Sequence, residues 1–223
     1  MKNKLLISAL TKVTAGIVLV AGLIFQPAGD LRFWQGWLLM GILFIPMLAA
    51  GFVMLKKAPE LLARRLDAKE KQSAQKGVVG GSALMFIAGF ILAGLNHRFC
   101  WYTLPPWASI VGAVLFLASY VLYAFVLKQN AYLSRTIRVE EGQSVVDSGL
   151  YGIVRHPMYS ATLLLFLSMP IVLGSVYALL VFLIYPVLIL VRIHGEEQLL
   201  EAELAGYSEY KKKVRWKLIP FVY

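Results

Sequence analysis

The sequence has little cysteine, little charge and none of the short motifs of common soluble enzymes. Cys100 is the only cysteine among 223 residues, so an internal disulfide and a cysteine-based metal site are excluded. The HExxH, CxxC, GxSxG and P-loop patterns are absent, and so is the GxGxxG pattern of Rossmann nucleotide sites. No metal site is predicted. Charged residues make up only 15% of the chain. A functional site must therefore be sought outside these common enzyme motifs.

Apolar residues are abundant and occur in long blocks. They make up 59% of the chain, and the mean hydropathy is +0.71. Six blocks are each close to the roughly 17 to 25 residues that a helix needs to cross the hydrocarbon core. These blocks are residues 5–26, 33–55, 78–96, 105–127, 158–174 and 176–193. The sequence therefore predicts an all-α integral membrane protein, a bundle of about six transmembrane helices with the lipid bilayer as its partner.

The chain is expected to form a single membrane domain, residues 1–223. We divide it into an N-terminal four-helix part, residues 1–127, and a part with chemically distinctive residues, 128–223. The fifth block is short, and Gly174-Ser175 after it is a turn signal. The last two blocks could therefore form a re-entrant helical hairpin instead of two full crossings.

Basic residues gather in alternate breaks between the blocks. They precede the first block, fill the break after the second and recur in the C-terminal tail. By the positive-inside rule, both the N and C termini are predicted to be cytoplasmic. Residues 59–76 are interpreted as an amphipathic helix on the membrane surface. The net charge of +10 is explained by these segments, so no nucleic-acid partner is expected. Oligomeric state cannot be read from the sequence.

A dense polar stretch, residues 149–159, stands where the fifth block begins. Arg155 and His156 are costly at bilayer depth, so they call for an anionic ligand, a second polar helix or water. Gly149 permits a tight turn, and Pro157 suits the first turn of the following helix. The stretch is the predicted functional site, with ordinary juxtamembrane charge as the other interpretation.

A second polar group ends the sixth block. Arg192 and Glu196 are four residues apart, so they share a helix face and can pair, whereas Glu197 points elsewhere. Paired carboxylates beside a cation can hold hydroxyls, an amino group or a sulfonium, although a surface cluster is the simpler interpretation. If the last two blocks fold back on each other, Arg155 and His156 meet this group. The result is a cofactor pocket at the cytoplasmic face.

Several segments carry a resemblance to a known family. In order, they are Val145-Val146-Asp147-Ser148-Gly149-Leu150-Tyr151, Arg155-His156-Pro157-Met158-Tyr159, Arg192 with Glu196-Glu197-Gln198-Leu199-Leu200, Gly206-Tyr207-Ser208-Glu209-Tyr210, and Val214 with Ile219-Pro220. Across residues 128–223, their order and spacing resemble the isoprenylcysteine carboxyl methyltransferase and phospholipid methyltransferase superfamily. Where this chain has Leu150 the family often has proline, and where it has Ala161 the family often has glycine. The leucine should loosen the turn, and the alanine should narrow the space for close packing beside it.

The resemblance implies a membrane-embedded enzyme that uses S-adenosylmethionine, with S-adenosylhomocysteine as product, and a lipophilic or lipidated acceptor. It implies a cofactor site made of Tyr151, Arg155, His156, Pro157, Tyr159, Glu196 and Glu197. Arg155 and Arg192 would orient the acceptor as catalytic residues, with Asn130 and Arg192 as substrate-binding residues. The tail after Tyr207 would close over the cofactor.

The sequence leaves the reaction open. A carboxylate acceptor is already ionised and needs only alignment and a guanidinium, so carboxyl methylation is the favoured reaction. Methylation of a phospholipid or small amine would need a base. NADPH-dependent sterol-reductase-like enzymes carry a similar RHPxY motif, but adjacent Glu196 and Glu197 disfavour a 2'-phosphate. A non-catalytic membrane protein is the remaining alternative.

Overall fold

The computed structural model describes residues 2–66, 73–130, 139 and 142–223. Within these ranges the chain is helical, and the only β-type pairing is an isolated antiparallel bridge between Thr103 and Ser175. The helices are α1 (Lys2–Ala28), α2 (Trp34–Lys57), α3 (Pro59–Leu66), α4 (Ser73–Arg98), α5 (Pro106–Gln129), the short 3-10 helix η1 (Gly149–Gly152), α6 (Pro157–Val172), α7 (Val176–Phe182), α8 (Ile184–Glu203) and α9 (Tyr207–Lys213). This confirms the predicted all-α class.

Within the described part of the chain, five helical segments are long and apolar enough to cross a membrane. They are Asn3–Ala28, Trp34–Lys57, Gln75–Arg98, Pro106–Gln129, and α7 with α8 together, Val176–Glu203. The protein is therefore an integral membrane protein. The fifth predicted block, residues 158–174, corresponds to α6, whose 16 residues extend only about 24 Å. Whether α6 and the segment formed by α7 and α8 make two full crossings or a re-entrant hairpin stays a prediction.

The turn between α6 and α7 has a clear sequence origin. Gly174 adopts a positive φ of 68°, which glycine allows without strain. The Ser175 hydroxyl then accepts a hydrogen bond from the Ala178 amide at 3.2 Å, which caps α7. The break between α7 and α8 at Leu183 follows from Pro186, because its ring disfavours a helical hydrogen bond to Phe182. Proline thus bends the last long apolar segment without ending it.

Glycines let the long helices approach closely. A Cβ on Gly94 of α4 would lie 2.5 Å from the Ile24 carbonyl oxygen of α1. A Cβ on Gly112 of α5 would lie 2.8 Å from the Val172 nitrogen of α6. Small residues at such crossings are typical of helices that pack in lipid, where van der Waals contact must hold the bundle together.

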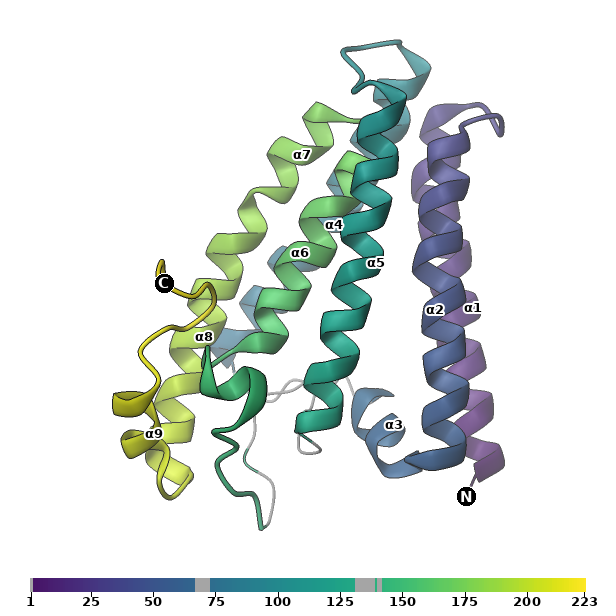
Figure 1. The fold of residues 1–223 in the computed structure, drawn as a ribbon. Coiled ribbons are helices and arrows are strands. Elements are labelled where there is room, and N and C mark those ends of the chain that lie inside the picture. The colour runs from purple at the N-terminus through teal and green to yellow at the C-terminus, as the bar shows by residue number, and fades with distance from the viewer. Residues whose placement is uncertain (1, 67–72, 131–138, 140–141) are drawn as a thin grey trace.

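The helices form a bundle with α1 and α2 at one side, α5 and α6 in the middle and α7 with α8 at the other side (Figure 1). The N-terminus, α3 and α9 lie at one end of it, which we call the motif end. Of the predicted surface helix 59–76, residues 59–66 form α3 and residues 73–76 belong to α4, whereas residues 67–72 lie outside the described residues. Leu62 is buried, so α3 packs on the bundle instead of lying apart from it.

Candidate functional site

The loop that carries the Arg155-His156 motif is fixed against the end of α5. Gly149 has a φ of 59°, and a Cβ there would lie 2.5 Å from the Gln129 side-chain nitrogen. The Leu150 amide donates to Gln129 Oε1 at 2.9 Å. The turn therefore needs glycine for two reasons, its backbone conformation and the space that Gln129 occupies.

The C-terminal segment 204–218, which we call the strap, lies along this loop. The Arg155 and His156 amides donate to the carbonyls of Trp216 at 2.8 Å and Lys217 at 2.9 Å. The Ser160 hydroxyl donates to the Leu218 carbonyl. Because these bonds join residues about sixty positions apart, the strap and the motif form one unit.

Glu197 lies at the centre of a buried ion cluster. Its Oε1 accepts from Arg155 Nε at 2.7 Å and lies 3.1 Å from His156 Nε2. Its Oε2 lies 3.8 Å from Lys211 Nζ and 3.7 Å from Lys217 Nζ. The side chains of Arg155 and Glu197 are only 4% and 6% exposed. Loss of either partner strongly destabilises the folded protein, because the other charge is left buried without compensation.

The strap occupies the remaining face of the Arg155 guanidinium. Its Nη1 donates to the carbonyl oxygens of Val214 and Arg215, both at 2.8 Å. Arg155 therefore fixes the strap to Glu197 on α8. This geometry favours a positioning role over direct contact with an acceptor.

The Tyr159 hydroxyl connects the two halves of the predicted site. It accepts from Arg192 Nε at 3.0 Å and donates to Glu196 Oε2. Arg192 and Glu196, predicted to share a helix face, are thus linked through a side chain of α6. Tyr159 is 5% exposed, so the relay lies inside the bundle.

Two buried tyrosine hydroxyls, of Tyr151 and Tyr207, make no hydrogen bond within the described residues. Burial raises the pKa of Tyr207, and the charges of Glu197 and Glu196 raise it further, which places this hydroxyl near both carboxylates. Burial also raises the pKa of Tyr151, and the Asn130 side chain at the end of α5 opposes this shift, so Asn130 lies close to that hydroxyl. Buried donors without a partner are rare in folded proteins, so the Tyr207 hydroxyl in particular is available to a ligand.

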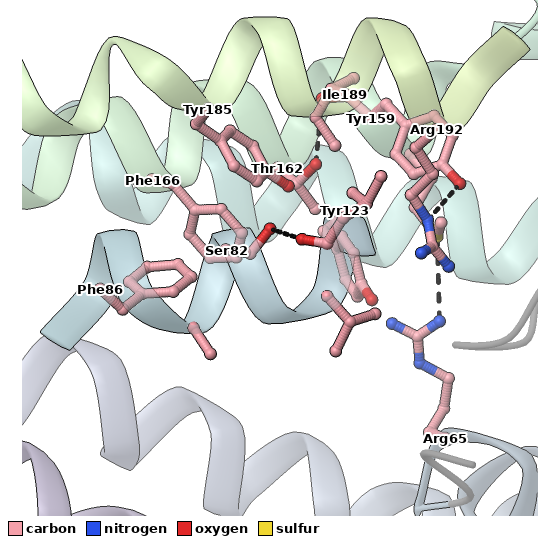
Figure 2. A pocket seen from close by; sticks show the side chains of 14 residues that line it. Arg65, Ser82, Phe86, Tyr123, Tyr159, Thr162, Phe166, Tyr185, Ile189 and Arg192 are labelled. Carbon is pink, nitrogen blue, oxygen red and sulfur yellow. Dashed lines mark hydrogen bonds between the residues drawn. The ribbon is translucent and has the colours of Figure 1, made fainter. Parts of the chain in front are cut away.

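A cavity of about 400 Å³ adjoins the relay on the side of the bundle interior (Figure 2). Its wall is mostly apolar or aromatic, and two arginines lie at its motif end. It is lined by Arg65, Val78, Val79, Ser82, Ala83, Phe86, Tyr123, Met158, Tyr159, Thr162, Phe166, Tyr185, Ile189 and Arg192. The volume is within the range of small-molecule sites.

The structure brings most of the predicted residues into one region. They come from η1, the loop before α6, the first turn of α6 and the middle of α8: Tyr151, Arg155, His156, Pro157, Tyr159, Arg192, Glu196 and Glu197. Sequence reasoning missed Arg65, which it counted only as a cytoplasmic charge, and the roles of Lys211 and Lys217. Arg65 lies far from the motif in sequence, so no local pattern could have placed it at the cavity.

Comparison with known proteins supports the same region. Residues 110–202 match the family model described as the isoprenylcysteine carboxyl methyltransferase (ICMT) family. The match runs from α5 to α8 and confirms the resemblance predicted from the motifs. It ends before the strap begins.

Curated relatives carry another description. A Delta(14)-sterol reductase of Methylotuvimicrobium alcaliphilum is 26% identical over 137 residues, 55% of this chain and 32% of the relative. That of Arabidopsis thaliana is 27% identical over 161 residues, 66% of this chain and 42% of the relative. That of Mus musculus is 33% identical over 91 residues, 40% of this chain and 22% of the relative. This chain therefore spans less than half the length of each.

Proposed function

We propose that the protein is an S-adenosylmethionine-dependent methyltransferase that acts on a lipophilic acceptor at the cytoplasmic membrane face, with carboxyl methylation as its reaction. The observation that carries the proposal is the ICMT family match at residues 110–202, which covers Tyr151, the Arg155-His156-Pro157 motif, Tyr159, Arg192 and both glutamates. The geometry adds that these residues come from η1, the start of α6 with the loop before it, and the middle of α8.

The residues fit a cationic cofactor. Glu196 and Glu197 supply carboxylates for its amino group and ribose hydroxyls, and the buried hydroxyl of Tyr207, which makes no hydrogen bond to the described residues, supplies a further hydrogen-bond partner beside Tyr151. His156 and Pro157 complete the wall beside them. When bound, the cofactor supplies an electrophilic methyl group on a sulfonium.

The protein's own residues would then align the acceptor and exclude water, which is most of what an in-line displacement requires. Arg192, held by the Tyr159 hydroxyl, is placed to bind an acceptor carboxylate with its guanidinium. Asn130 at the end of α5 is a further candidate for acceptor binding. Arg155 acts indirectly, by holding the strap that covers the site.

The reductase remains a second candidate, and one structural observation favours it. Glu197 is compensated by Arg155, Lys211 and Lys217, so it does not present an unopposed negative charge to a 2'-phosphate. The two lysines could themselves meet a phosphate. Together with the sterol-reductase relatives, this makes NADPH the necessary comparison ligand.

Calorimetric titration of the purified protein in detergent distinguishes the two. We expect S-adenosylhomocysteine to bind and NADPH not to bind. Binding of NADPH alone would replace the proposal by the reductase. Amine or phospholipid methylation would instead show as cofactor binding with transfer to those acceptors and none to a lipophilic acid.

A further inference from the structure

Residues 219–223, which we call the tip, follow the strap and form a closed turn. The amides of Leu218 and Ile219 both donate to the Tyr223 carbonyl, at 2.8 and 3.0 Å. The Val222 amide donates to the Ile219 carbonyl at 3.1 Å. The tip is therefore a folded turn, and its outward side chains form a defined surface.

This surface is apolar and largely uncovered within the described residues. Phe221 is 86% exposed, Val222 is 72% exposed and Ile219 is half exposed. The tip lies outside the five described segments that could cross a membrane, so contact between a spanning helix and lipid does not account for its exposure. Exposed apolar side chains that gather in one place mark a contact surface.

Cations border the apolar side chains of the tip. Lys212, Lys213 and Arg215 of the strap are exposed. Lys217 Nζ lies 4.9 Å from the centroid of the Tyr223 ring. Apolar and aromatic side chains beside lysine and arginine are typical of segments that lie in the headgroup region of a bilayer, where anionic lipids attract the cations. The charge of the strap is therefore complementary to an anionic lipid surface.

The position of the tip agrees with a lipid contact. The Ser160 hydroxyl in the first turn of α6 donates to the Leu218 carbonyl, so the tip begins beside an apolar helix. In Figure 1 the chain rises from α9 toward the middle of the bundle before it reaches its last residue. The tip therefore lies nearer to the apolar part of the bundle than α9 does.

We infer that the tip is a membrane anchor, whose apolar side chains insert at the boundary between headgroups and acyl chains while the cations of the strap bind anionic headgroups. The strap carbonyl that binds the His156 amide belongs to Lys217, directly before Leu218 and the tip. Lipid contact at the tip therefore holds the strap against the Arg155-His156 motif. This inference holds whichever reaction the site carries.

Site-directed spin labelling in lipid nanodiscs measures the depth of the tip. Single labelled cysteines are placed in a Cys100→Ser background, because Cys100 is the only cysteine of the chain. Accessibility to O₂, which concentrates in lipid, is compared with accessibility to a water-soluble nickel complex. Val222→Cys carries the label on the tip, and Ser208→Cys carries it on the exposed surface of α9.

We expect the Val222 label to be accessible to O₂ and about tenfold less accessible to nickel than the Ser208 label. A label at Val187→Cys, on the exposed apolar surface of α8, shows the values for lipid contact. Equal nickel accessibility at Val222 and Ser208 would place the tip in water and overturn the inference. Low accessibility of the Val222 label to both reagents would mean that another protein surface covers the tip, which also overturns it.

A double variant tests whether the anchor holds the strap. Phe221→Ser with Val222→Ser removes the apolar side chains and leaves the backbone hydrogen bonds of the strap in place. Trypsin cleavage of the strap in nanodiscs should then become about tenfold faster or more. The matched control is Phe52→Ser with Val53→Ser, because this pair is exposed on α2 and should leave cleavage of the strap unchanged.

The lipid dependence of the same assay tests the charge. Wild type should be cleaved several-fold faster in nanodiscs of phosphatidylcholine alone than in nanodiscs that also contain phosphatidylglycerol, because the cations then lose their anionic partners. Equal cleavage of wild type and the tip variant, or a wild-type rate that ignores lipid charge, would contradict an anionic lipid anchor for the strap.

Discussion

Glu197→Gln removes the carboxylate charge that Arg155, His156, Lys211 and Lys217 share. The amide keeps the shape of the side chain and one acceptor oxygen. Arg155 would remain almost fully buried with its opposite charge gone. The strap, whose carbonyls hold the same guanidinium, should then open more often.

The size of the effect follows from burial. Removing one partner of a buried ion pair costs about 3 to 5 kcal/mol. The glutamine oxygen can still accept from Arg155, and the carbonyls of Val214 and Arg215 remain, so about 2 to 3 kcal/mol is expected here. Since about 1.4 kcal/mol is a factor of ten, the open population of the strap should rise about 30- to 150-fold.

Limited proteolysis measures this population directly. The strap contains several trypsin sites after lysine or arginine, and cleavage follows the open population when opening and closing are fast. The control is Glu201→Gln. Glu201 pairs with Lys211 at 2.6 Å, but both side chains are 37% exposed, so its loss should change the rate less than about fivefold.

Equal cleavage rates in wild type and Glu197→Gln would refute the reasoning, because they would mean that the strap is held without the buried ion pair. Equal acceleration in both variants would attribute the effect to general loss of negative charge. Only a large change confined to Glu197→Gln supports the cluster as the anchor.

Three further outcomes are expected. Gly94→Ala should lower the unfolding temperature in detergent at a cost of about 1 to 3 kcal/mol, because the new methyl group meets a backbone oxygen of α1, whereas Gly80→Ala, with no atom within 4 Å, should not. Tyr207→Phe should leave the unfolding temperature unchanged or raise it, since the hydroxyl is buried without a partner, and should weaken S-adenosylhomocysteine binding several-fold in calorimetry. The hydrogen bond from Lys213 lowers the pKa of Asp147. This exposed pair therefore stabilises the strap at pH values above the ordinary aspartate pKa of about 4, and the stabilisation is lost as pH falls through the lowered pKa. Hydrogen exchange in α9 should become faster at low pH in wild type, and Asp147→Asn should not show this pH dependence.

Composition predicted the membrane character and the positions of the first four long helices, because twenty or so consecutive apolar residues have few other structural solutions. The predicted hairpin of the last two blocks also placed Arg155 and Glu197 close together, because a turn at Gly174 reverses the chain. The short fifth block, residues 158–174, was also predicted from the turn signal at Gly174-Ser175, and it corresponds to α6. The break at Leu183 between α7 and α8 was not predicted, because apolar residues continue through it.

Long-range contacts set the limit of such prediction. The hydrogen bonds from Arg155 and His156 to the strap involve backbone carbonyls, which every residue possesses, so no side-chain pattern marks them. Arg65 reaches the cavity through the packing of α3, which depends on the whole bundle. The predicted division into residues 1–127 and 128–223 stays a prediction, although the cavity is lined from both sides of that boundary.

The charge distribution around Glu197 does not by itself decide between the two candidate reactions. The carboxylate is balanced by Arg155, Lys211 and Lys217, so this cluster does not separate a sulfonium cofactor from a 2'-phosphate. The distinction therefore depends on the cofactor titration. Binding of S-adenosylhomocysteine without NADPH supports the methyltransferase, and binding of NADPH alone supports the reductase.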